Sequence, residues 1–160
     1  MPLPSTMTPI ATTTGSGASS ITFSSIPSTY TDLTLVVGGT VSSGVSCYIR
    51  INGDTGSNYS YTYLQGDGTS ASSGRASNAT WMYYGPMHDQ GNTIIMQLQS
   101  YSNTSVNKTV LFRQNSHLVT GTVVGLWRNT SAINSVTVIT GGVQTFPSTT
   151  SFTLYGIKAA

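Results

Sequence analysis

Charged side chains are scarce in this chain. Asp, Glu, Lys and Arg together make up 6% of its 160 residues, against roughly 25% in a typical soluble protein. Glutamate is absent, and the acidic residues are Asp32, Asp54, Asp67 and Asp89. With a formal net charge of +2, the chain gains little solubility from charge and depends on hydration of its Ser, Thr and Asn side chains, or on assembly. The composition favours assembly.

Two further shortages exclude whole classes of function. The six basic residues are scattered singly, whereas nucleic-acid binding requires a cluster of them to neutralise neighbouring phosphates. The single cysteine, Cys47, excludes an internal disulfide and a zinc site built from several cysteines. We therefore expect no nucleic-acid partner, and packing has to supply the stability.

Long hydrophobic runs are also missing. No window approaches the ~20 apolar residues that a membrane span requires, and residues 1–6 have neither the basic nor the apolar region of a secretory signal. We expect no membrane partner and synthesis in a cytoplasm, although the polar composition is typical of extracellular proteins.

The chain does contain a clear β pattern. Hydrophobic residues make up 38% of it, which is enough apolar surface to offset the chain entropy that would otherwise favour disorder. Apolar positions alternate, as Ile94, Met96 and Leu98 do, and this is typical of strands with one buried face. We predict an all-β fold, an antiparallel β-sandwich similar to a jelly roll, with about eight strands at 19–24, 32–38, 45–52, 92–102, 108–115, 120–128, 133–140 and 151–157.

A single β-sandwich domain is expected over residues 19–160, because ~100–200 residues is the usual size of a domain. Residues 1–18 have few apolar positions, so we expect an extended N-terminal arm there. Residues 58–65 stay ambiguous, since their tyrosines fit both a strand and one helical turn. Residues 66–78 are predicted to form an exposed polar loop.

Candidate catalytic groups are few. The aspartates stand at turns or strand starts, where capping is their ordinary role, and a paired-carboxylate hydrolase would need two of them close together. His88 and His117 leave a Ser-His-Asp arrangement open, but no nucleophile-elbow or phosphate-loop motif supports an enzyme. We expect no catalytic activity. Cys47 falls in an alternating strand, where the expected role is that of a small buried hydrophobic side chain.

One loop has part of a metal-binding pattern. Residues 52–58 place oxygen-bearing side chains at alternate positions, as in the first half of a calcium loop, but Tyr63 stands where the closing acid should be. An ordinary turn capped by Asp54 is the favoured alternative. We expect no metal and no other cofactor.

Aromatic residues gather in two neighbouring segments. As an exposed set they could stack on sugars or contact a partner protein, and the candidate residues are Tyr59, Tyr61, Trp81, Tyr83 and Tyr84. Core packing with hydrogen-bonded hydroxyls is the alternative, and it is the more ordinary role of such side chains. The sequence leaves both open.

Three stretches resemble a module of virion proteins from tailed bacteriophages, notably those that infect cyanobacteria and marine bacteria. They are SITFSSIP at 20–27 followed by YTDL at 30–33, RINGDTGSNY at 50–59, and a third set that combines 125–127, 132–136 and 152–158. The resemblance covers nearly the whole chain after the expected arm. It implies a jelly-roll-like sandwich used on capsid surfaces and tail fibres, typically as a homotrimer, and it implies no catalytic residues.

The resemblance favours a capsid cement or decoration protein, because fibre proteins usually have a long N-terminal region or shaft where this chain has a short arm. The expected partners are the major capsid protein and further copies of the chain. The expected location is the capsid surface of a virion that is assembled in the host cytoplasm and released by lysis. The alternative is a tail-fibre, receptor-binding or carbohydrate-binding module with a host glycan as partner. The missing glutamate counts against a third class, the polysaccharide-degrading enzymes.

Overall fold

The computed structural model describes residues 6–158, which form twelve β-strands and no helix. Eight strands form the larger sheet: β1 (Met7–Thr14), β3 (Asp32–Gly39), β5 (Tyr59–Gly66), β6 (Ala71–Ala79), β8 (Asn92–Leu98), β9 (Lys108–Asn115), β10 (Thr120–Trp127) and β12 (Ser151–Ile157). Four strands form the smaller sheet: β2 (Ser20–Phe23), β4 (Val45–Ile51), β7 (Met82–Met87) and β11 (Val136–Thr140).

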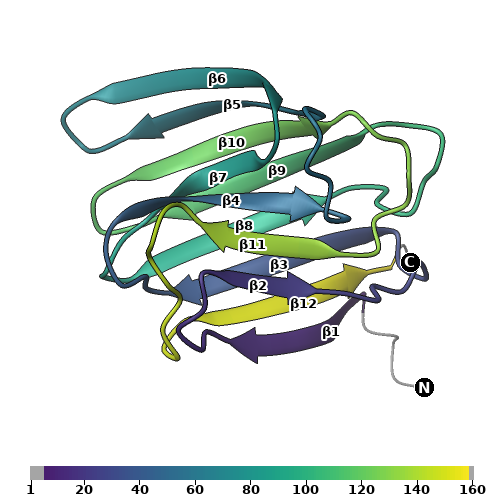
Figure 1. The fold of residues 1–160 in the computed structure, drawn as a ribbon, viewed down its shortest axis with the longest axis horizontal. Helices are drawn as coiled ribbons and strands as arrows, with labels where there is room; N and C mark the ends of the chain where they lie inside the picture. Colours follow the sequence, from purple (N-terminus) through teal and green to yellow (C-terminus); the bar gives the residue numbers. More distant parts are fainter. Residues whose placement is uncertain (1–5, 159–160) are drawn as a thin grey trace.

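The two sheets are antiparallel and face each other as a sandwich (Figure 1). Their strand orders are β1-β12-β3-β8-β9-β10-β5-β6 and β2-β11-β4-β7. Strands from the first half of the chain pair with strands from its second half. The pairs are nested one inside the next along the sequence: β1·β12, β2·β11, β3·β8 and β4·β7. This nesting is compatible with a jelly roll in which two hairpins, β5–β6 and β9–β10, have been inserted. The all-β sandwich predicted from the sequence is confirmed.

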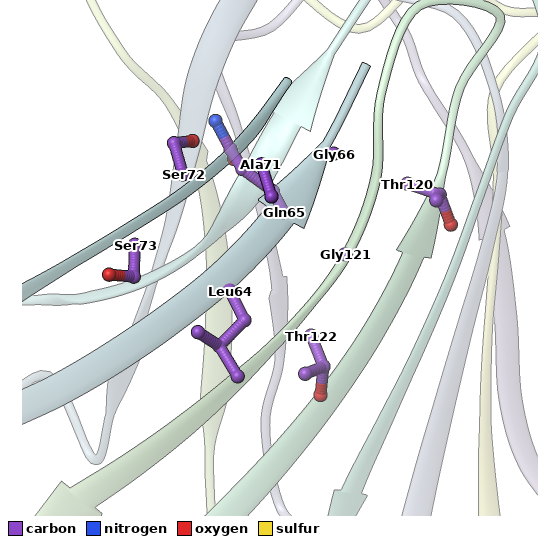
Figure 2. A pocket seen from close by; sticks show the side chains of 9 residues that line it. All are labelled: Leu64, Gln65, Gly66, Ala71, Ser72, Ser73, Thr120, Gly121 and Thr122. Atoms are coloured by element: carbon purple, nitrogen blue, oxygen red, sulfur yellow. The ribbon is translucent and has the colours of Figure 1, made fainter. Parts of the chain in front are cut away.

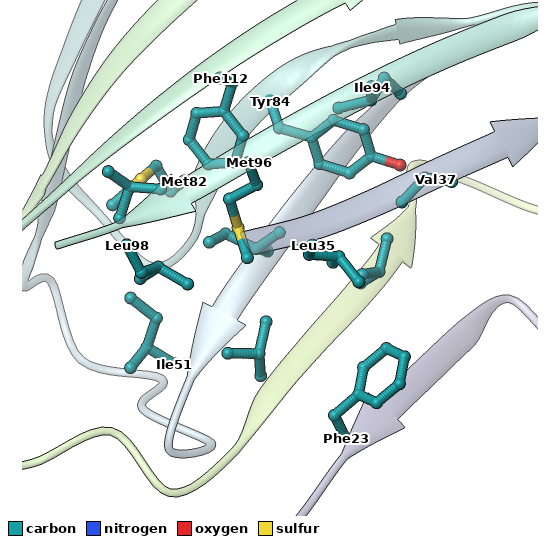
Figure 3. Close-up of a cluster of buried hydrophobic side chains, with 14 of the residues drawn as sticks. Phe23, Leu35, Val37, Ile51, Met82, Tyr84, Ile94, Met96, Leu98 and Phe112 are labelled. Atoms are coloured by element: carbon teal, nitrogen blue, oxygen red, sulfur yellow. The ribbon is translucent and has the colours of Figure 1, made fainter. Parts of the chain in front are cut away.

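The core lies between the sheets and follows the predicted alternation. Ile94, Met96 and Leu98 of β8 are all buried, and so are Val136 and Val138 of β11. Figure 3 shows side chains from both sheets meeting in this cluster. Since strands have a side-chain period of two, the intervening residues, such as Ile95, Gln97 and Thr137, face outward.

The structure has twelve strands where the sequence pattern predicts eight. The eight predicted segments correspond to β2, β3, β4, β8, β9, β10, β11 and β12, with β8 and β11 shorter than expected. The ambiguous segment forms β5, and β7 follows as an additional strand. The predicted loop at 66–78 is wrong in part, because Ala71–Ala79 pairs with β5 as the edge strand β6. Its side chains are nevertheless mostly exposed, as expected of a loop.

The N-terminal segment also differs from a free arm. Met7–Thr14 pairs with β12 along its whole length and forms one edge of the larger sheet. The partly buried side chain of Ile10 packs against the core, so the sheet begins within the segment expected to be an arm. Residues 1–5 of that segment lie outside the described residues.

The inserted hairpins make the two sheets unequal in width. The smaller sheet ends at β7, which packs across β10 of the larger sheet. β5 and β6 continue beyond that edge and lie at one end of the molecule (Figure 1). The inner face of β5 is therefore only partly covered by the other sheet.

Candidate functional site

Asp32, Asp54 and Asp67 cap turns and loops. Asp32 accepts a hydrogen bond from the Ser100 amide, and Asp67 accepts two from the amides of Thr69 and Ser70. Backbone hydrogen bonds lower the pKa of the Asp67 carboxyl, because they favour its ionised form. These contacts agree with the capping role predicted for the aspartates.

The two histidines lie side by side between β7 and the β9–β10 turn. Their ring centroids are 5.4 Å apart, and burial, together with the neighbouring His117, lowers the pKa of His88. Within residues 6–158, neither imidazole is hydrogen-bonded to a carboxylate or to a serine hydroxyl. The pair therefore lacks the contacts by which a catalytic triad orients its histidine.

Asp54 holds the loop between β4 and β5 in place. One carboxylate oxygen accepts the Gly56 amide at 2.8 Å, and the other accepts Asn58 Nδ2 at 2.9 Å and Trp127 Nε1 at 2.7 Å. Partial burial alone would raise the pKa of Asp54, but these hydrogen bonds outweigh it and lower the pKa. Protein donors thus occupy the oxygens that a calcium ion would need, which supports the capped turn.

The same loop is anchored through Asn52. Its Oδ1 accepts hydrogen bonds from the amides of Asn134 and Ser135, and its Nδ2 donates to the Ala132 carbonyl.

Within the described residues, no group of three or more His, Cys, Asp or Glu side chains is placed to hold a metal ion.

Cys47 is fully buried in β4, as the alternation predicts. Burial raises the pKa of its thiol to about 12, so the reactive thiolate is scarce at neutral pH. We expect iodoacetamide at pH 8 to alkylate the native protein at no more than about 10⁻³ of the rate seen in urea, because reaction requires opening of the fold. Mass spectrometry of quenched samples measures both rates, and comparable rates would contradict the burial of this side chain.

Figure 2 shows a shallow hollow at the ends of β5, β6 and β10. It is lined by residues 64–66, 71–73 and 120–122, and these are Gly, Ser, Thr, Ala, Leu and Gln. None of these side chains can act as an acid, a base or a metal ligand of the usual kinds. The hollow therefore offers polar and apolar contacts but no acid–base pair.

One broad surface is uncovered: the face of the eight-stranded sheet that points away from the smaller sheet, here called the outer face. Leu64, Leu111 and Val124 are 59%, 37% and 49% exposed there. Val124 is directly opposite Leu111, and Leu64 lies diagonally from Val124 across the β5–β10 pair. These three side chains form a continuous apolar patch among threonines. Among residues 6–158, the charged side chains on this face are Arg75, Arg113 and Asp32.

Three of the five predicted contact residues come together where β5 passes the edge of the smaller sheet. Tyr83 of β7 has its ring centroid 5.8 Å from that of Tyr61, 5.4 Å from that of Tyr63 and 6.0 Å from that of Tyr48. Trp81 continues the row, with its ring 5.0 Å from Tyr48. Trp81 is 39% exposed, and the four tyrosines are half-buried. We call these five residues the aromatic ledge.

The other two predicted contact residues belong to the core. Tyr59 and Tyr84 are 0% and 1% exposed, so neither can contact a ligand in the folded protein. The Tyr59 hydroxyl receives a hydrogen bond from the Ile51 amide, and that of Tyr84 donates to Met87 Sδ. For these two residues the core alternative is correct.

The predicted set missed Tyr48 and Arg50, which lie on the outward side of β4. The Arg50 guanidinium is 5.5 Å from the centroid of the Trp81 ring, and its Nε donates to the Thr80 carbonyl. The signal in the sequence was the alternation itself: Cys47 and Ile49 are buried, so their neighbours Tyr48 and Arg50 must face outward.

No protein-family model matches the sequence, and no curated protein matches it at a significant level. The described residues contain no helix that is long and apolar enough to cross a membrane.

Proposed function

We propose that this chain is a structural protein of a tailed bacteriophage particle: a decoration protein that binds the major capsid protein as a homotrimer and reinforces the capsid lattice. The observation that carries the proposal is the outer face of the eight-stranded sheet. It is broad, nearly without charge, and apolar where β9, β10 and β5 expose Leu111, Val124 and Leu64. A contiguous exposed apolar patch of this kind is typical of an interaction surface.

The size of the outer face suits a stable protein contact. Eight strands spaced about 4.8 Å apart, each about seven residues long at about 3.3 Å per residue, cover on the order of 900 Å². A standard protein interface buries roughly 800 Å² on each partner. The outer face is therefore large enough to seat the protein on a neighbouring subunit without help from another surface.

The proposed action is mechanical. A subunit that lies across the joint between two capsid proteins buries area that is lost when they separate, so its binding energy opposes their separation. Trimerisation multiplies the attachment points and raises the avidity without new contact chemistry. Such a role requires no acid–base pair, which agrees with aspartates that serve as caps.

Val124→Asp tests the proposal. A carboxylate at the centre of the apolar patch would have to be desolvated in the interface, so we expect capsid binding to fall at least about a hundredfold, while the Tm changes by no more than about 2 °C because the residue is exposed. Co-sedimentation with capsids stripped of the protein measures the binding, and sedimentation equilibrium measures whether trimers persist.

The matched control is Val143→Asp, which introduces the same change at a side chain that is 90% exposed outside both sheets. It should bind as the unmodified protein does. If Val124→Asp binds capsids normally, or if both variants lose binding equally, the outer face is not the attachment surface.

The aromatic ledge favours a second candidate, a receptor-binding module at the tip of a tail fibre. Aromatic side chains with polar tips are common in recognition sites. The unmodified protein separates the two candidates: binding to host cells and none to stripped capsids would favour the fibre module.

A further inference from the structure

The tyrosine hydroxyls of the aromatic ledge lack a protein partner in the part of the chain that the structure describes. Within residues 6–158, those of Tyr48, Tyr61, Tyr63 and Tyr83 make no hydrogen bond. Core tyrosines behave differently, since the Tyr101 hydroxyl, for example, donates to the Pro27 carbonyl. Hydroxyls without protein partners remain available to water or to a ligand.

These hydroxyls also lie near one another. Burial raises the pKa of Tyr83 far above its usual value. The neighbouring hydroxyls of Tyr63, Tyr48 and Tyr61 raise it further, because negative charge on those groups would repel a phenolate at Tyr83. Burial, followed by Tyr48 and Tyr63, raises the pKa of Tyr61 in the same way. These shifts keep the Tyr61 and Tyr83 hydroxyls protonated, and a protonated phenol can both donate and accept a hydrogen bond.

Trp81 ends the row of rings in the ledge, and Arg50 lies beside it. Trp81 offers a large apolar ring that is 39% exposed. The Arg50 guanidinium beside it makes one hydrogen bond, from Nε to Thr80, and its remaining N–H groups point to no protein acceptor among the described residues. The ledge thus combines aromatic faces with hydrogen-bond donors and acceptors. The centroids of neighbouring rings in the row are 5.0 to 6.0 Å apart.

We infer that the aromatic ledge is a binding site for a saccharide chain. A sugar ring presents apolar C–H faces that pack on aromatic rings, and hydroxyls that pair with groups able both to donate and to accept. The site goes beyond capsid attachment and does not depend on it, because the ledge and the outer face lie on different surfaces.

Other ligand classes fit the ledge less well. Single-stranded nucleic acid also stacks on aromatic rings, but it requires a positively charged groove along its backbone. Arg50 is the only charged side chain that contacts the ledge among residues 6–158. An anionic peptide would lack cationic partners for the same reason. A neutral, hydroxyl-rich chain matches the groups that are present.

Titration of the full chain tests the inference. The probes are a panel of neutral oligosaccharides and of polysaccharides from bacterial surfaces, with a thymidine oligonucleotide as the competing class. A bound sugar should change the fluorescence of exposed Trp81, while Trp127, which is 1% exposed, stays silent. Calorimetry should then show that Trp81→Ala and Tyr83→Phe each weaken binding by about tenfold or more, the effect of one lost contact.

Tyr83→Phe removes one oxygen that makes no hydrogen bond among the described residues, so it leaves the fold unchanged and separates loss of binding from loss of structure. Tyr155→Phe on β12 is the matched control and should bind sugar normally. Val124→Asp should also retain sugar binding, so the test is independent of capsid attachment. Absence of binding by every saccharide, preference for the oligonucleotide, or full affinity in both ledge variants would overturn the inference.

Discussion

Lys108→Met should destabilise the protein by about 3 to 5 kcal/mol and lower its Tm by about 10 °C. Lys108 is 1% exposed, and its Nζ donates to the carbonyls of Asn103, Val106 and Thr130 at 2.6, 2.8 and 3.0 Å. All three ammonium protons are thereby used. Methionine keeps the length and volume of the side chain but leaves three carbonyl groups without their donor. Denaturant unfolding followed by circular dichroism measures the loss.

The expected loss is large because the ammonium group joins two loops. Asn103 and Val106 precede β9, whereas Thr130 follows β10, so one side chain ties both connections to the same end of the sandwich. Lys158→Met is the control: Lys158 is exposed and stacks on the Tyr30 ring, and its replacement should change the free energy of unfolding by less than about 1 kcal/mol. Equal effects of the two substitutions would show that the three carbonyl contacts contribute nothing.

Asp54→Asn should cost about 2 kcal/mol at pH 7. The amide group can replace only one carboxylate oxygen as an acceptor, whereas the carboxylate serves Gly56, Asn58 and Trp127. Whichever way the new amide turns, its NH2 group faces at least one of these N–H donors, which then loses its acceptor. Asp89→Asn is the control, since Asp89 has no side-chain hydrogen bond among the described residues, and it should leave stability unchanged.

The Asp54 effect should depend on pH in one direction. The pKa of Asp54 is lower in the folded protein than in the unfolded chain, where it is about 3.9. Its contribution is therefore fully present above about pH 4 and is lost as the pH falls through the folded pKa. The difference in unfolding free energy between Asp54→Asn and the unmodified protein should shrink below about pH 4. A difference that stays constant from pH 7 to pH 2 would contradict the proposed role of the carboxylate.

Much of the fold could be predicted from the sequence because local patterning dictates it. Period-two alternation identifies a strand and its buried side without knowledge of its neighbours, as Val136 and Val138 illustrate in β11. The missed strands lack that signal. β6 is rich in Ser and Ala and depends on pairing with β5, and β7 contains Gly85 and Pro86, which are typical of turns. Pro86 fits because β7 is an edge strand.

The candidate site could be predicted only in part, because alternation gives the face of a residue but not which strands lie side by side. Tyr61 and Tyr83 were identified as a set, yet they meet only because β5 extends past the edge strand β7. Tyr84 follows Tyr83 directly and therefore points the opposite way, into the core. Lys108 was counted only as one of six scattered basic residues, although it shares its parity with the buried Val110 and Phe112.

The central claim is that this protein acts by lying against a neighbour through the outer face of its larger sheet. Electron cryomicroscopy of the proposed phage particle tests this claim most directly. We predict density for the sandwich on the capsid shell, with β8, β9 and β10 turned toward the capsid protein and the aromatic ledge open to solvent. Density confined to the tail, or a capsid-bound sandwich whose outer face points into solvent, would contradict the claim.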